Sequence, residues 1–143
     1  MGFRASPRVR RSCAIAVPLG LVAVLAVTLV SCVGDKSDAS AQSVVTGFVD
    51  ALNDRDAEAA AELTSYPNAA EESIQQMFDG LDAKESTWTL AQFMELNGDS
   101  GFFTVDAAWN FGEGKDWSYF VDGGVKKLAV GWRISWDPTL LAP

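Results

Sequence analysis

Residues 103–111 read Phe-Thr-Val-Asp-Ala-Ala-Trp-Asn-Phe. Apolar side chains occupy every odd position of this stretch, and polar ones occupy most of the even positions. Because successive side chains of a β-strand point to opposite faces of a sheet, this alternation predicts a strand with one buried face. Clusters of turn-forming residues at 97–101 and 112–114 flank it, so we expect antiparallel neighbours on both sides.

Three more segments show the same two-residue period. The segment before the first turn cluster places these side chains on one face, with Gln92 as a polar exception: Trp88, Leu90, Met94 and Leu96. The third strand is expected at Trp117, Tyr119 and Val121. Asp122-Gly123-Gly124 then predicts a hairpin turn into a fourth strand, which carries Leu128, Val130, Trp132, Ile134 and Trp136. The four segments predict an antiparallel meander.

Upstream of these strands the apolar period is that of a helix. It places Val45, Phe48, Val49 and Leu52 on one face of a first helix. Asp56 is placed as the N-cap of a short second helix that reaches Leu63, and Tyr66-Pro67 ends it. A third helix follows with Ile74, Met77, Phe78 and Leu81, and it closes at Gly80 and Asp82. We therefore expect an α+β fold in which three helices cover one face of a curved sheet of about four strands.

The N-terminal segment has the form of an export signal. Residues 12–34 carry no charge and follow four arginines, and the run ends in Leu29-Val30-Ser31-Cys32. This ending resembles the lipobox of bacterial lipoproteins, which implies that Cys32 carries lipid and becomes the first mature residue. The expected division is a signal over 1–31, a polar tether over 32–43 and a domain over 44–143. An uncleaved membrane anchor and cleavage after Ala41 remain alternatives.

Charge and composition restrict the partners and the chemistry. From Cys32 onward the chain has seven Lys or Arg against nineteen Asp or Glu, a formal charge of 7 − 19 = −12. Nucleic acid is therefore not an expected partner, because its binding rests on neutralising phosphates. The chain has no His, which removes the commonest general base and metal ligand. No cofactor and no metal site are expected.

The tryptophans predict either a densely packed core or an apolar pocket. All five tryptophans fall in the expected strands. The sequence does not choose between the two arrangements. If a pocket exists, the candidates for its lining are Trp88, Trp109, Trp132 and Trp136.

The C-terminal string Trp132-Arg133-Ile134-Ser135-Trp136-Asp137-Pro138 and the junction Asn53-Asp54-Arg55-Asp56-Ala57 carry a resemblance to a known family. Over residues 43–143 the chain resembles the N-terminal domain of penicillin-binding transpeptidases related to the methicillin-resistance enzyme, a cone-shaped nuclear-transport-factor-2-like (cystatin-like) fold. Ala142 stands where that family often has His. The resemblance implies a non-catalytic domain that holds a transpeptidase away from the membrane and offers a surface to partners.

We therefore expect the chain to be the non-catalytic N-terminal domain of a penicillin-binding lipoprotein that acts in peptidoglycan synthesis. The lipoprotein would be anchored to the outer face of the cytoplasmic membrane. Its partners would be a transpeptidase domain in cis or other cell-wall synthesis proteins. The transpeptidase motifs Ser-x-x-Lys and Lys-Thr-Gly do not occur in the chain. The alternative is a free-standing lipoprotein that binds a small apolar ligand or an envelope partner. An isomerase of this fold would need a carboxylate inside the cone, and alternation places Asp106 on the opposite face.

Overall fold

The computed structural model describes residues 39–142, so the export signal and Cys32 lie outside the described residues. Three helices precede four strands in the chain. The helices are α1 (Ala41–Asn53), α2 (Ala57–Glu62) and α3 (Pro67–Leu81). The strands are β1 (Glu85–Leu96), β2 (Ser100–Asn110), β3 (Asp116–Leu128) and β4 (Gly131–Ile134).

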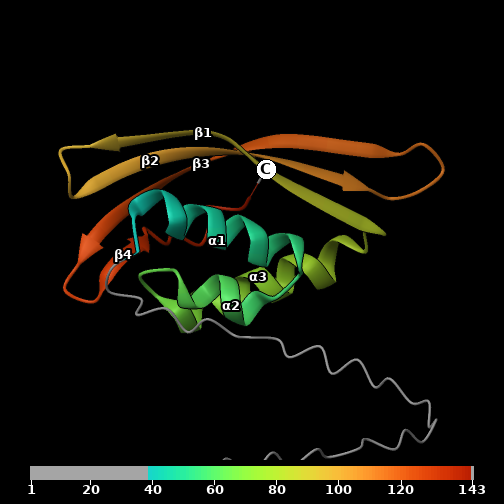
Figure 1. The fold of residues 1–143 in the computed structure, drawn as a ribbon. Helices are drawn as coiled ribbons and strands as arrows, with labels where there is room; N and C mark the ends of the chain where they lie inside the picture. The colour runs from blue at the N-terminus through green and yellow to red at the C-terminus, as the bar shows by residue number, and fades with distance from the viewer. Residues whose placement is uncertain (1–38, 143) are drawn as a thin grey trace, which may run out of the picture. The chain divides into compact units, whose positions relative to one another are not determined.

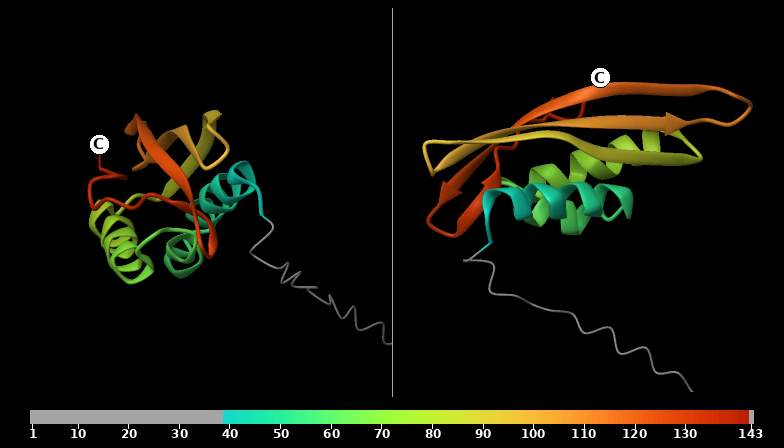
Figure 2. Two further views of the ribbon diagram at one scale, coloured as in Figure 1. Left: turned by 90° about the vertical axis from the view of Figure 1, so that its left-hand side faces the viewer. Right: turned by 45° about the horizontal axis from the view of Figure 1, so that its top comes forward.

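The strands form one antiparallel sheet in the order β1-β2-β3-β4, and the helices lie against one of its faces (Figure 1). The sheet curls, so that the short strand β4 lies beside the start of α1 while the β2–β3 hairpin runs out beyond the helices (Figure 2). The expected α+β arrangement is confirmed. Within residues 39–142, no helix combines the length and hydropathy that crossing a bilayer requires.

Local capping signals set the helix boundaries. The hydroxyl of Ser40 accepts a hydrogen bond from the Ser43 N–H, and the carboxylate of Asp56 accepts one from Ala59. Pro67 stands in the first turn of α3, where its missing N–H costs nothing. Helix α1 begins three residues earlier than the expected boundary at 44, and Ala41 is buried. The tether expected over 32–43 is therefore too long, because its last residues belong to the domain.

Strand β2 follows the predicted alternation. Its inward side chains Phe103, Val105, Ala107 and Trp109 are buried, and the residues between them face outward. The helices supply the other half of the core through Val45, Phe48, Leu52, Ile74 and Phe78. Burial of these apolar faces against each other is the main term that stabilises the fold.

Strand β1 departs from the simple alternation. A β-bulge lies between Leu90 and Gln92, because Leu90 pairs with Val105 and Gln92 pairs with Thr104. The extra residue reverses which side chains face the helices. Phe93 consequently packs against the core, whereas Met94 and Leu96 are 46% and 43% exposed. The expectation that Met94 and Leu96 share the inward face of Trp88 is wrong for this reason.

The Gly123-Gly124 pair does not form the predicted turn. Strand β3 runs through both glycines, and the chain reverses later, at Ala129 and Val130. Gly123 pairs with Phe103 across the sheet, and a Cβ at Gly123 would overlap the Phe103 ring. The glycine is therefore needed for close packing inside a strand. The late reversal also leaves Leu128 and Val130 exposed, against expectation.

In the Asn53–Asp56 junction, the side chain of Arg55 binds backbone carbonyls at and after the C-terminal end of α3. Arg55 donates hydrogen bonds to the carbonyls of Phe78 at 3.2 Å and Ala83 at 3.5 Å, and its guanidinium lies 5.0 Å from the Phe78 ring centroid. Cations near the carbonyl end of a helix are stabilising, and Arg55 sits at the end of α3. The junction thus ties the first two helices to the third.

Candidate functional site

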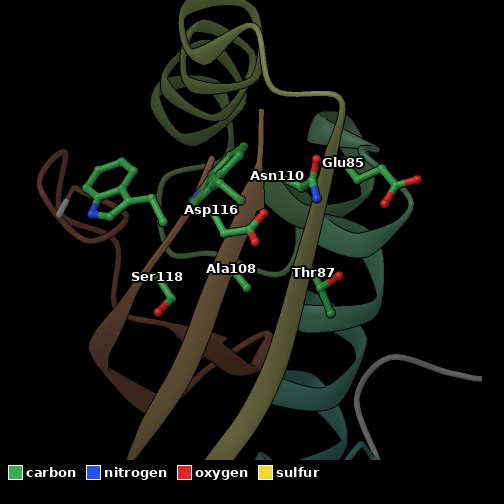
Figure 3. A pocket seen from close by; sticks show the side chains of 8 residues that line it. Glu85, Thr87, Ala108, Asn110, Asp116 and Ser118 are labelled. Atoms are coloured by element: carbon green, nitrogen blue, oxygen red, sulfur yellow. The ribbon is translucent and has the colours of Figure 1, made fainter. Parts of the chain in front are cut away.

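The outer face of the sheet carries a shallow hollow where β1 begins, β2 ends and β3 begins (Figure 3). Its volume is about 440 Å³. Register places Glu85, Asn110 and Asp116 in one row across the three strands. Within residues 39–142, no group of three or more His, Cys, Asp or Glu side chains is arranged to hold a metal ion. The hollow is a polar surface depression with two carboxylates.

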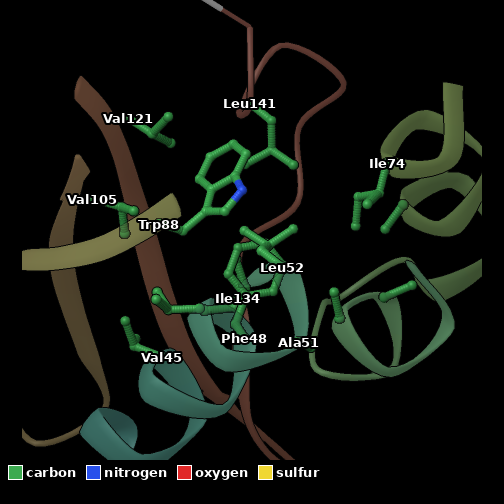
Figure 4. Packing of buried hydrophobic residues seen from close by; sticks show 14 of the residues in the cluster. Val45, Phe48, Ala51, Leu52, Ile74, Trp88, Val105, Val121, Ile134 and Leu141 are labelled. Carbon is green, nitrogen blue, oxygen red and sulfur yellow. The ribbon is translucent and has the colours of Figure 1, made fainter. Parts of the chain in front are cut away.

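The inner face of the sheet is filled by the tryptophans that were candidates for a pocket lining. Trp88 and Trp109 are 2% and 1% exposed and meet edge to face, with ring centroids 5.5 Å apart. Figure 4 shows Trp88 packed among core side chains that include Leu52, Ile134 and Leu141. Trp132 and Trp136 are also buried. These four indoles form part of the core. Trp109 also borders the hollow at the strand ends, and Trp136 also borders a groove beside α3.

Three of these indoles carry an unsatisfied polar atom. The Nε1–H groups of Trp88, Trp109 and Trp136 are buried and make no hydrogen bond of acceptable geometry. Most buried donors in proteins find an acceptor, because an unpaired buried donor is costly. In the described part of the chain the only buried polar residue is Thr64, whose hydroxyl donates to the Ala61 carbonyl at 2.7 Å.

Residues 135–142, which we call the closing segment, leave β4 and fold back across α3. The expected fourth strand therefore ends at Ile134, before Trp136. The Trp136 N–H donates to Ser65 Oγ at 3.0 Å, and the Tyr119 hydroxyl donates to the Leu141 carbonyl at 2.8 Å. Leu141 is buried in the core. An Asp-Pro-Thr sequence is typical of such a chain reversal and was a signal for it.

The closing segment and α3 border a groove, which we call the α3 groove. Its volume is about 470 Å³. Helix α3 contributes Ser73, Gln76, Met77 and Leu81, and the opposite wall is made by Tyr119, Trp136, Pro138, Leu141 and Ala142. None of these side chains is charged at neutral pH. Burial raises the pKa of the Tyr119 phenol, an effect partly opposed by the nearby Trp109 indole, so Tyr119 stays neutral.

Asp106, the one acid within a clearly predicted strand, lies on the outer face between the buried Val105 and Ala107. Alternation predicted this placement. The described residues therefore place no carboxylate among the core side chains of the cone. An apolar groove lined with hydrogen-bonding groups can bind a molecule, but its lining contains no group suited to act as a general base at neutral pH.

Residues 40–143 match the family described as the NTF2-like N-terminal transpeptidase domain. The chain belongs to this family. The match extends over the described domain. In this family the domain is the non-catalytic part. A comparison of the sequence with curated proteins gave no significant match.

Solved structures support the same fold. A cystatin-fold protein from Novosphingobium aromaticivorans aligns with a TM-score of 0.53 at 7% identity, covering 68% of this chain and 97% of that one. An NTF2-like protein of unknown function from Shewanella oneidensis aligns with a TM-score of 0.50 at 11% identity, covering 64% and 88%. A cystatin-like domain of unknown function from Nostoc punctiforme gives 0.53 at 17% identity, covering 64% and 68%. At these identities the likeness concerns the fold alone.

Proposed function

We propose that this domain is the non-catalytic, membrane-proximal spacer and interaction module of a penicillin-binding lipoprotein in peptidoglycan synthesis. The observation that carries the proposal is the family match over residues 40–143. In this proposal Cys32 holds the chain at the outer face of the cytoplasmic membrane through its lipid. The transpeptidase domain in cis, or other cell-wall synthesis proteins, would be the partner.

The filled interior of the cone supports a non-catalytic role. Enzymes that use a carboxylate base in an apolar pocket need space for a substrate beside that base. Here Trp88, Trp109 and Phe78 pack against one another where a pocket would lie. The one acid of β2, Asp106, faces away from them. The interior thus serves stability.

The path of the chain supports a spacer role. In the left view of Figure 2, the start of α1 and the end of the described chain lie on opposite sides of the domain. A domain that is entered on one side and left on the other holds its flanking segments apart. Three large apolar side chains that are more than half exposed offer contacts for a partner: Tyr66, Phe120 and Val130.

The test is an immunoblot of membranes from the source cells beside a fluorescent-penicillin gel. The antibody is raised against residues 39–142, and a lane pre-treated with unlabelled penicillin controls for specific acylation. We expect a band much larger than the 15.3 kDa of this chain that also takes up penicillin. A lone band at or below 15.3 kDa would overturn the proposal in favour of a free-standing binding lipoprotein.

A further inference from the structure

We propose that residues 126–133, which we call the hairpin tip, dock on the surface of a lipid bilayer. In this proposal the apolar turn of the tip enters the lipid chains and its cations contact the headgroup phosphates. The nearness of a membrane rests on the lipid anchor of the proposed function, but not on penicillin binding. Three observations carry the inference: an apolar turn, a set of cations around it, and its position beside the start of the domain.

The turn between β3 and β4 consists of apolar residues. Strand β3 ends at Leu128, Ala129 and Val130 make the reversal, and β4 begins at Gly131. Turns usually contain Asn, Asp, Ser or Pro beside Gly, because these residues favour turn backbones. Here Leu128 and Val130 are instead 43% and 62% exposed. Their apolar surface leaves water only when another apolar phase covers it, as the interior of a bilayer would.

Positive charge gathers around this turn, against the charge of the domain as a whole. Residues 39–142 contain six Lys or Arg and seventeen Asp or Glu, and three of these six cations lie in the hairpin tip: Lys126, Lys127 and Arg133. Residues 123–136 contain no acidic residue. Within the described chain none of the three cations forms an ion pair, whereas Lys115 pairs with Glu113. The tip thus differs in charge from the rest of the surface.

Two of these cations lie directly opposite each other. Lys126 pairs with Arg133 in the register of β3 and β4, so both side chains lie on the same face of the hairpin. Like charges in this arrangement are destabilising. The hydrogen bond from Arg133 to the Trp132 carbonyl, at 2.7 Å, leaves the positive charge in place. Phosphate oxygens bind both Arg and Lys, and a phosphate between the two would offset their repulsion.

The acidic character of the domain limits this attraction without cancelling it. Asp99 of the neighbouring turn lies close to Lys127, whose N–H donates to the Asp99 carbonyl at 2.8 Å. Charges farther away are screened, because the Debye length at physiological ionic strength is about 8 Å. The cations therefore supply part of the affinity for a bilayer, and the apolar turn supplies the rest.

The position of the hairpin tip fits a membrane partner. Strand β4 contacts α1, and Figures 1 and 2 show the β3–β4 turn at the same end of the domain as the start of α1. An acylated Cys32 would stand seven residues before Ala39, the first described residue, which gives a reach of at most about 25 Å. An anchor on so short a segment would hold this end of the domain near the bilayer.

The first experiment places the full chain in vesicles that hold a trace of phosphatidylcholine with a diazirine in its acyl chain. Light attaches this lipid to residues that enter the hydrocarbon, and mass spectrometry maps them. We expect label on the peptide around Cys32, which reports the anchor, and on residues 128–131. Leu128→Ser combined with Val130→Ser should abolish the second label. Phe120→Ser, which removes a side chain that is 68% exposed in the middle of β3, should leave it intact.

The two labelled regions separate this inference from the anchor. An unlabelled hairpin tip beside a labelled peptide around Cys32 would overturn the docking and leave the anchor standing. Label on the tip alone would support the docking and contradict the anchor. Label on the tip that survives the two serine substitutions, or falls equally in Phe120→Ser, would overturn the role of the apolar turn.

The second experiment tests the cations. In wild type, the label on the tip should be stronger in vesicles that contain anionic phosphatidylglycerol than in vesicles of phosphatidylcholine alone, by about fivefold for each cation that no acid offsets. Lys126→Gln combined with Lys127→Gln should bring this ratio close to one. Lys84→Gln combined with Lys115→Gln removes two exposed cations elsewhere and should leave the ratio unchanged. Because the ratio is taken within one variant, a general loss of stability would not imitate the result. A ratio of one in wild type, or an equal fall in both double variants, would overturn the role of the cations.

Discussion

The side-chain amide of Asn53 hydrogen-bonds twice to the backbone of Trp88. Asn53 Nδ2 donates to the Trp88 carbonyl at 2.8 Å, and the Trp88 N–H donates to Asn53 Oδ1 at 2.8 Å. Because β1 is an edge strand, these two backbone groups have no neighbouring strand to pair with. Asn53 thus takes the place of a strand residue and joins the end of α1 to the sheet, which also protects the edge.

Replacing Asn53 by Ala should lower the free energy of unfolding by about 2 kcal/mol, because it leaves a partly buried donor and acceptor unpaired. Chemical denaturation followed by tryptophan fluorescence would measure this. Asp54→Ala, at the exposed neighbouring position, should change stability by less than about 0.5 kcal/mol. Equal losses in the two variants would show that the amide does not hold the strand.

Gly123→Ala should destabilise the domain by about 1–3 kcal/mol, because the new methyl group overlaps the fully buried Phe103 ring. Gly124→Ala is the control, since its Cβ would meet Ser135 Oγ at an ordinary 3.6 Å. Thermal unfolding measures both. In a Phe103→Leu background, Gly123→Ala should cost less, and an unchanged cost there would count against the steric explanation.

The Asp137 carboxylate should stabilise the closing segment in a pH-dependent manner. Hydrogen bonds from the side chain and the backbone N–H of Thr139 lower its pKa below the ordinary value of 3.8. A carboxyl whose pKa is lowered by folding contributes stability above its unfolded pKa and loses it as the pH falls through the folded pKa. Wild type should therefore unfold at a higher denaturant concentration than Asp137→Asn near neutral pH, and the difference should shrink below pH 3.8. A difference that stays constant with pH would contradict this.

Cys32→Ser should abolish incorporation of radiolabelled palmitate into the chain and leave the uncleaved precursor. The lipobox proposal requires the thiol of Cys32 as the acylated group. Cys13→Ser removes the other cysteine of the sequence, which lies within the expected signal, and should leave labelling intact. Palmitate labelling that persists in Cys32→Ser would refute Cys32 as the lipid attachment site, whereas the absence of labelling in wild type would favour the uncleaved spanning segment.

The junction Asn53–Asp56 shows which roles of its residues could be predicted from the sequence and which could not. From the sequence, Asp56 was predicted as a helix cap, and the structure confirms it. The roles of Asn53 and Arg55 were not predictable, because their partners Trp88 and Phe78 lie 35 and 23 residues further along the chain. The four tryptophans show the same limit. Their position in or beside strands followed from alternation, but whether they line a pocket or fill a core depends on the helices opposite them.

The sequence alone determined the order of three helices and four strands, the cap that Asp56 provides for α2 and the buried face of β2. These features depend on neighbouring residues and on the periods of 3.6 and 2, which are local properties of the chain. Only the tertiary structure decided the bulge after Leu90, the passage of β3 through Gly123 and the closing segment that borders the α3 groove. Each of these depends on contacts between distant segments: a strand register, a ring that needs space, and a chain reversal that buries Leu141 against the core. Local pattern cannot contain such information, because the energy of those contacts exists only once the segments have met.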